Sequence, residues 1–105
     1  MDMLTIDGEL PVAMTVLDGQ KPLKLKKMVM QQLTVGQSIK SQATLRADQF
    51  IVVGELAAMT QLIDEHGKLY PLSYDALENS SRQNFDYLAG LRGELDAKEQ
   101  AESLS

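Results

Sequence analysis

The sequence predicts an α+β fold, in which an N-terminal β-hairpin is followed by three or four helices and the content is mainly helical. Three patterns predict this class. An alternating segment with a turn dipeptide opens the chain, an apolar run covers residues 50–63, and leucines at three- and four-residue spacing follow beyond residue 84.

Residues 10–17 alternate, and their apolar side chains share one face of an extended strand: Leu10, Val12, Met14 and Val16. The Asp-Gly dipeptide at 18–19 then suits a turn, because both residue types tolerate positive φ. A second strand follows at 23–30. Because Pro22 cannot donate to a ladder, we expect a loop longer than two residues. Lys27 falls on the apolar side of this strand, which indicates a bulge or a strand end there.

The segment Thr34-Val-Gly-Gln37 has the form of a capping box and predicts a helix over 35–46. The apolar stripe of this helix is thin, so we expect a surface helix with one packed side: Val35, Ile39 and Ala43. Asp48 can cap a second helix over 49–63. That helix is apolar around most of its circumference, so it needs cover from a core, from another protein or from both.

Gly67 is expected to end this helical segment through the turn 64–67. Residues 70–72 then predict an extended connector, because Pro71 disfavours helical geometry in its predecessor. Ser73 is placed to cap a short helix that ends at Leu77.

Ser80-x-x-Gln83 forms a second capping box and predicts a final helix over about 81–98. The core stripe of this helix is the set Phe85, Leu88, Leu91 and Leu95. Gly90 and Gly93 disfavour a helix, so they suggest that another backbone approaches closely. We therefore expect a single domain over 1–98 and a polar, disordered tail over 99–105.

Composition excludes several classes of protein. The chain has 105 residues, no cysteine and a formal net charge of −5, which argues against disulfides, Cys-based metal sites and binding to a phosphate backbone. The apolar run is shorter than the roughly 20 residues that a bilayer requires. The acidic N-terminus has no signal-peptide pattern. We expect a soluble protein of the cytoplasm that binds neither nucleic acid nor membrane.

No catalytic pattern is evident. His66 stands beside Asp64 and Glu65, but adjacent turn residues point in divergent directions, whereas helical zinc ligands recur one turn apart. Neither a nucleophile elbow nor a glycine-rich phosphate loop occurs. We therefore predict no enzyme activity, no catalytic or metal-binding residues and no cofactor.

Lysines and methionines gather in the second strand. Its lysines could bind an acidic partner or a phosphate backbone, but the favoured interpretation is protection of an exposed sheet edge: Lys21, Lys24, Lys26 and Lys27. Met28 and Met30 lie beside them, and we expect them to be partly exposed unless a helix covers them. Methionine surfaces adapt to varied apolar partners, so this pair is a candidate for partner binding.

The order of these elements resembles the tail assembly chaperones of Mu-like phages and prophages. The resemblance lies in the segments VLDGQKPLKLKK, LTVGQSI, FIVVGELAAMTQLI and YPLSYDALENSSRQNFDYLAGLRGEL, which together cover most of the chain. It implies a non-enzymatic protein of the host bacterial cytoplasm that binds the tape measure protein and assists assembly of the tail tube. The tail tube protein is a second implied partner, and self-association is a further alternative.

A helix-binding chaperone needs an oily surface. The predicted partner-binding residues are Met28, Met30, Phe50, Val53, Leu56, Ala57, Phe85 and Leu88. The same residues are also the obvious core, and both interpretations stay open at this point. Two alternative functions remain, a structural tail component of the virion and a small DNA-binding regulator that would use the helix at 35–46.

Overall fold

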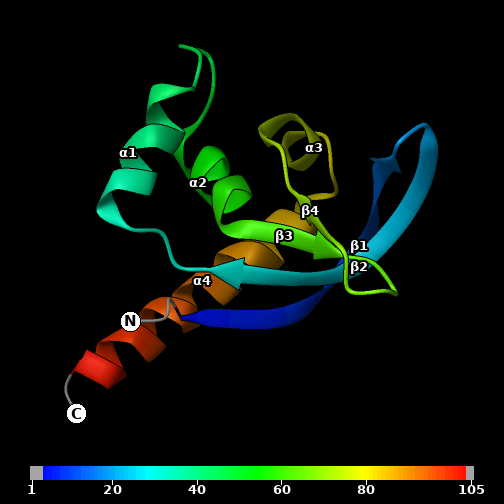
Figure 1. Ribbon diagram of the computed structural model, residues 1–105. Helices are drawn as coiled ribbons and strands as arrows, with labels where there is room; N and C mark the ends of the chain where they lie inside the picture. The colour runs from blue at the N-terminus through cyan, green and yellow to red at the C-terminus, as the bar shows by residue number, and fades with distance from the viewer. Residues whose placement is uncertain (1–3, 104–105) are drawn as a thin grey trace.

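The computed structural model describes residues 4–103 as a four-stranded antiparallel sheet with four helices (Figure 1). The strands lie in the order β1-β2-β3-β4, so each pairs with its neighbour in sequence. Their bounds are β1 Thr5–Asp18, β2 Lys21–Gln31, β3 Thr60–Ile63 and β4 Leu69–Pro71. The helices are α1 Val35–Ala43, α2 Ile51–Met59, α3 Tyr74–Glu78 and α4 Arg82–Ser103. The predicted α+β class with an N-terminal hairpin is confirmed.

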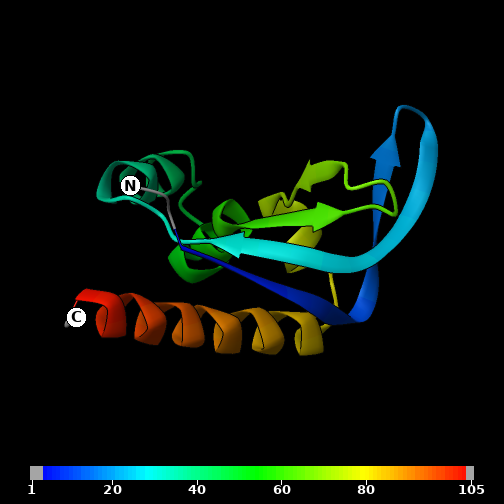
Figure 2. The ribbon, with the colours of Figure 1, turned by 60° about the horizontal axis from the view of Figure 1, so that its bottom comes forward.

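The core lies between one face of the sheet and the helices that cover it. Figure 1 looks onto the sheet with α4 behind it, and Figure 2 shows α4 running along that face. Helix α2 contacts both α3 and α4. The most deeply buried apolar side chains are Leu10, Met28, Met30, Leu56, Leu62, Leu88 and Leu95. Each such side chain contributes about 1.5–3 kcal/mol through burial, so this layer dominates the stability of the fold.

The first two strands form a tight hairpin. Asp18 pairs with Lys21, and Gly19 at φ 65° leads the two-residue connection between them. The predicted longer loop is therefore wrong. Pro22 is tolerated in β2 because β3 pairs only with residues 28–30, which leaves an open edge beside the proline.

A bulge interrupts this hairpin. Residues 10–13 of β1 stand opposite Lys26 alone, between the pairs Glu9–Lys27 and Met14–Leu25. The predicted irregularity near Lys27 is confirmed, although the extra residues belong to β1. The bulge turns Val12 outward, where it is 40% exposed, so the expectation that Val12 shares the buried face is wrong.

Helix α4 holds the bulge in place. The buried amide of Asn84 accepts a hydrogen bond from Val12 N–H at 3.0 Å and donates one to Val12 C=O at 2.9 Å. The Tyr87 hydroxyl accepts from Glu9 N–H at 3.0 Å. Beyond the bulge the paired strands bend away from the sheet as an extension that we call the hairpin arm, residues 14–25 (Figures 1 and 2).

The apolar run over 50–63 begins as a helix and ends as a strand. Helix α2 ends at Met59 and Thr60 begins β3 with no loop between them, so the predicted helix over 49–63 is confirmed over Ile51–Met59 and wrong beyond it. Thr60 is extended at φ −113° and ψ 138°, and its hydroxyl donates to Leu56 C=O at 2.7 Å. Strand β3 pairs with β2 on one side and β4 on the other, and those ladder bonds outweigh the local helical pattern.

Caps and turns agree with the sequence in several places. The Thr34–Gln37 capping box forms, Ser73 accepts a hydrogen bond from Ala76 N–H, and Gly67 adopts φ 83° in the turn between β3 and β4. The expected connector at 70–72 is largely strand β4. Asp48 does not cap α2. The N-cap is Phe50, without a side-chain hydrogen bond.

Helix α4 differs from its prediction at both ends. The Ser81 hydroxyl accepts from Gln83 N–H, while the Ser80 hydroxyl donates to Leu77 C=O, so the predicted Ser80–Gln83 box does not form. The helix continues to Ser103, so residues 99–103 of the expected disordered tail are helical. The end of that tail lies outside the described residues. The predicted core stripe is confirmed, with Phe85 half-buried against three buried leucines.

We expect Asn84→Ala to destabilise the protein by about 1–3 kcal/mol, because it removes both hydrogen bonds to Val12 and leaves a void in the core. Urea denaturation followed by circular dichroism measures the loss. The matched control is Asn79→Ala, whose amide also bonds a carbonyl, at Asp75, but at an exposed site. Equal losses in the two variants would contradict a special role for Asn84.

Two glycines of α4 face open space. A Cβ added at Gly90 or Gly93 would meet no other element of residues 4–103 within 4 Å, so the expectation of a close backbone there is wrong. Gly90→Ala and Gly93→Ala should each raise the free energy of unfolding by about 0.5–1 kcal/mol, since both lie in an exposed helix interior. Thermal denaturation measures the gain. As a contrast, Gly8→Ala should destabilise, because its Cβ would overlap the Tyr87 hydroxyl.

Candidate partner-binding surface

Most of the predicted partner-binding residues belong to the core. Met28, Met30, Leu56, Ala57 and Leu88 are buried. Val53 and Phe85 are half-buried and pack against that core, while Phe50 is 67% exposed. The exception allowed for the two methionines applies, because helices cover their face of β2 and both side chains are buried.

Helix α1 exposes the apolar side chains that sequence reasoning assigned to packing. Val35 is 80% exposed and Ile39 is 62% exposed, and α1 contains no buried residue. Its half-buried side chains are instead Ser38 and Ser41. The helix therefore faces the rest of the protein with serine side chains and shows its apolar stripe to solvent. An isolated surface helix normally does the reverse.

Polar contacts hold α1 in this orientation. The Ser38 hydroxyl donates to Glu55 Oε2 on α2 at 2.6 Å, and the other oxygen of Glu55 lies 3.4 Å from Arg92 Nη2 on α4. The Glu55 side chain is 15% exposed and that of Arg92 is 32% exposed. This partly buried ion pair connects three helices, and the serine contact fixes which side of α1 faces inward.

The start of α2 adds a second group of exposed apolar side chains. Phe50 is 67%, Ile51 52% and Val52 43% exposed. Phe50 N–H donates to the Tyr74 hydroxyl at 2.8 Å, which fixes this end of the helix against α3. The exposed apolar side chains thus form two groups on neighbouring helices, which we together call the α1–α2 apolar surface: Val35 and Ile39 on α1, and Phe50, Ile51 and Val52 at the start of α2.

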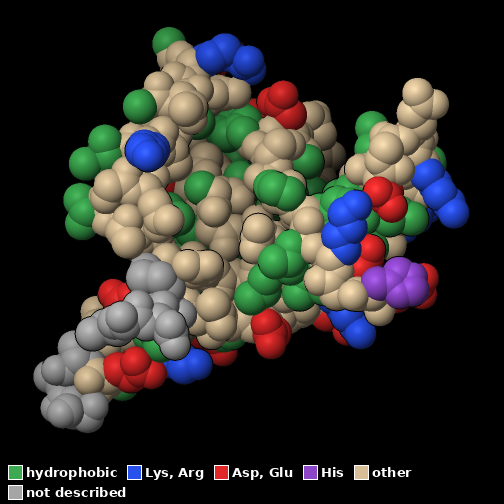
Figure 3. Space-filling view, in the orientation of Figure 1, with side chains coloured by type: hydrophobic (Ala, Val, Ile, Leu, Met, Phe, Trp, Pro, Cys, Tyr) green, Lys and Arg blue, Asp and Glu red, His purple; other side chains and the backbone are tan. Residues whose placement is uncertain are grey.

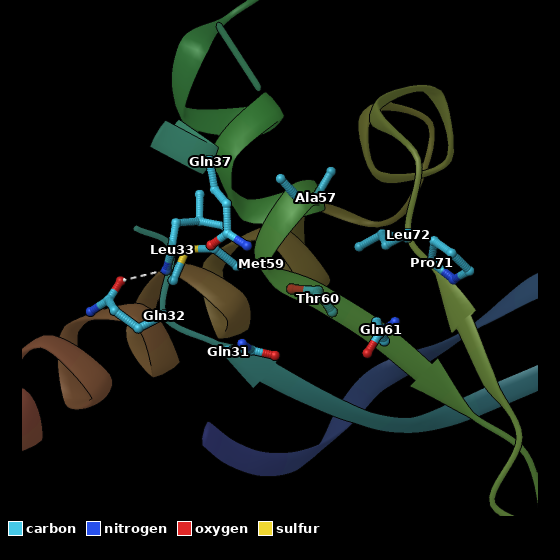
Figure 4. Close-up of a pocket in the computed structure, with 11 residues that line it drawn as sticks. Gln31, Gln32, Leu33, Gln37, Ala57, Met59, Thr60, Gln61, Pro71 and Leu72 are labelled. Carbon is cyan, nitrogen blue, oxygen red and sulfur yellow. Dashed lines mark hydrogen bonds between the residues drawn. The ribbon is translucent and has the colours of Figure 1, made fainter. Parts of the chain in front are cut away.

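A pocket of about 230 Å³ lies where the end of β2 passes beneath α1 and α2 (Figure 4). Four glutamines contribute amide groups to it: Gln31, Gln32, Gln37 and Gln61. The Gln32 side chain accepts from Leu33 N–H at 3.3 Å, as the dashed line in Figure 4 marks. None of the lining residues carries an ionisable group. The pocket can offer hydrogen bonds and apolar contact, and it holds no acid, base or nucleophile that titrates near neutral pH.

Leu33 links this pocket to two neighbouring hollows. A hollow of about 250 Å³ includes Val35 and Ile39 in its lining, and another of about 330 Å³ lies along Lys40 and Thr44. Leu33 lines all three. Helix α1 is thus bordered by open space on more than one side, which leaves room for side chains of another molecule.

The side chain of Asp64 stabilises the turn at 64–68. Asp64 Oδ1 accepts from His66 N–H and from Lys68 N–H, both at 2.8 Å. The hydrogen bond from Lys68 N–H is the main reason why the pKa of Asp64 lies below its usual value. The imidazole of His66 lies in solvent, 3.4 Å from Glu65. Among residues 4–103, no group of three or more His, Cys, Asp or Glu side chains could hold a metal ion.

Lys68 also joins this turn to the hairpin arm. Its ammonium lies 3.0 Å from Asp18 Oδ1, and this bond raises the pKa of Lys68. The ammonium also stands 5.2 Å from the centre of the Tyr70 ring. Burial is the main cause of the raised pKa of Tyr70. These contacts anchor the arm to the sheet at one point.

The lowered pKa of Asp64 predicts a pH dependence of stability. Its ionised form contributes stability that is fully present above the unfolded pKa and is lost as pH falls through the lower folded pKa. Asp64→Asn should therefore destabilise the protein at pH 7, and the difference from the unmodified protein should shrink below about pH 4. Urea denaturation across that range measures it. A difference independent of pH would contradict this account.

No helix among residues 4–103 combines the length and the apolar character needed to cross a bilayer. No family model matches the chain, and neither a curated protein nor a solved structure shows significant similarity to it.

Proposed function

We propose that this protein is a phage tail assembly chaperone, which works in the host bacterial cytoplasm and binds the tape measure protein without performing chemistry. Two separate lines support the proposal. The sequence resembles that family along most of its length. The α1–α2 apolar surface gives a partner helix a place to dock, although the predicted residues are mostly core.

The orientation of α1 is the observation that carries the proposal. Leaving Val35 and Ile39 in water forgoes about 25 cal/mol for each Å² of apolar area that could be buried. A helix that packs through Ser38 and Ser41 accepts this loss in the free protein and recovers it when a partner covers the stripe. Helix-in-groove recognition works through such stripes at three- and four-residue spacing.

A tape measure protein suits this surface because its long helices expose apolar stripes until the tube encloses them. A chaperone must cover those stripes reversibly, and a surface of five exposed apolar side chains is small enough to release its partner. The tail tube protein is a second partner under this proposal, since tube subunits replace the chaperone as they assemble.

The proposal predicts that Val35→Asp with Ile39→Asp weakens binding while the fold persists, because α1 has no buried residue. The protein is co-expressed with fragments of a phage tape measure protein, and size-exclusion chromatography detects the complex. Binding should weaken at least about tenfold, as charges buried in an apolar contact require.

The matched control is Leu17→Asp with Leu69→Asp. These two leucines are 66% and 47% exposed but lie outside the α1–α2 apolar surface. The control should bind as the unmodified protein does. Equal binding by both double variants would exclude this surface. Mass spectrometry of purified virions separates a chaperone, which is absent from the particle, from a structural tail component, which is present.

A further inference from the structure

Charge is strongly segregated along this chain. Residues 19–47 contain six of the ten basic residues and none of the fifteen acidic ones. Four of the six are the lysines of β2, which we call the arm lysines because they lie on the hairpin arm or directly beyond its end: Lys21, Lys24, Lys26 and Lys27. All four are exposed, and none forms an ion pair with another described residue. In a protein of net charge −5, such a set of unpaired cations stands out.

The nearby acids do not pair with these lysines. Asp18 is bound to Lys68, Asp64 accepts two backbone hydrogen bonds within its own turn, and Glu9 stands opposite Lys27 in the ladder without forming an ion pair with it. Figure 3 shows Lys and Arg side chains on the side of the hairpin arm, next to the histidine and acids of this turn. The arm lysines therefore keep their charge available for another molecule.

The opposite end of the molecule carries the complementary charge. The last three turns of α4 include Glu94, Asp96 and Glu99, with Lys98 as the one base in that stretch. The last turn of α4 contains no basic residue, although a helix C-terminus favours cations. Figure 2 shows this end of α4 reaching past the sheet. The acidic side chains at the C-terminal end of α4 and the negative end of the helix dipole both favour a cationic partner.

We propose that two copies of this chain associate in an antiparallel pair, in which the arm lysines of each copy contact the acidic end of α4 in the other. The molecule extends 45 Å along its longest axis, with the arm and the end of α4 at opposite ends (Figure 1). An antiparallel arrangement places each set of arm lysines against an acidic helix end. It closes as a dimer with two-fold symmetry, which is the commonest symmetry of oligomers. This pairing does not depend on the chaperone role.

Salt gives the pair a distinctive signature. Two proteins of net charge −5 repel each other, so a purely apolar dimer would tighten as salt screens that repulsion. A pair held by complementary ends behaves in the opposite way, because the same screening weakens its local attractions. The direction of the salt effect therefore separates the two kinds of contact.

Sedimentation equilibrium of the full chain at about 0.01 M and about 1 M NaCl tests the proposal, since the Debye length falls from about 30 Å to about 3 Å between them. We expect dimers at low salt and an at least tenfold weaker association at high salt, roughly as for other steered contacts. A monomer in both conditions, or a dimer that tightens with salt, overturns the proposal.

Charge exchange identifies the contact. Lys24→Glu with Lys26→Glu should abolish the dimer, and so should Glu94→Lys with Glu99→Lys. The protein that combines all four changes should dimerise again, because the attraction is restored with reversed signs. Lys40→Glu with Arg46→Glu is the control, since it changes the net charge equally at and just beyond α1 and should leave the dimer intact. A combined variant that folds, as circular dichroism reports, and stays monomeric overturns the proposal.

Discussion

The hydrogen bonds between Asn84 and Val12 connect the last helix to the first strand and determine how the rest of the chain is arranged. The amide offers one donor and one acceptor to the same backbone unit, as a neighbouring strand would. It thereby stabilises the bulge of β1, whose residues have no partners of their own in the ladder with β2. The bulge shifts the register between β1 and β2, and it marks where the hairpin arm leaves the sheet.

Local chemistry made much of this fold predictable from sequence. The alternation and the Asp-Gly turn predict the hairpin, the Thr34–Gln37 pair predicts the start of α1, and the spaced leucines predict the buried face of α4. The predictions that were wrong concern residues whose structure depends on contacts between distant segments. Residues 60–63 have a helical pattern and become a strand only because β2 and β4 lie on either side. No local signal in the run distinguishes Met59 from Thr60.

The candidate surface was hidden for a related reason. Sequence periodicity identifies an apolar stripe but does not tell which side of a helix the protein covers. The sequence predicts the apolar stripe of α1, and such a stripe is expected to face the core. The structure turns it outward because Ser38 reaches Glu55, a partner seventeen residues away that Arg92 positions from a third helix. The sequence signal that could have predicted this orientation is Glu55, an acid inside an apolar run that needs a polar partner such as a serine of α1.

The direct junction of α2 and β3 has a mechanical consequence. Because no linker separates Met59 from Thr60, a rotation of α2 acts directly on β3. Strand β3 is joined to β2 through only a short ladder over residues 28–30, and to β4 through one equally short. Force applied where α2 begins, at Phe50, is therefore delivered to these two short ladders.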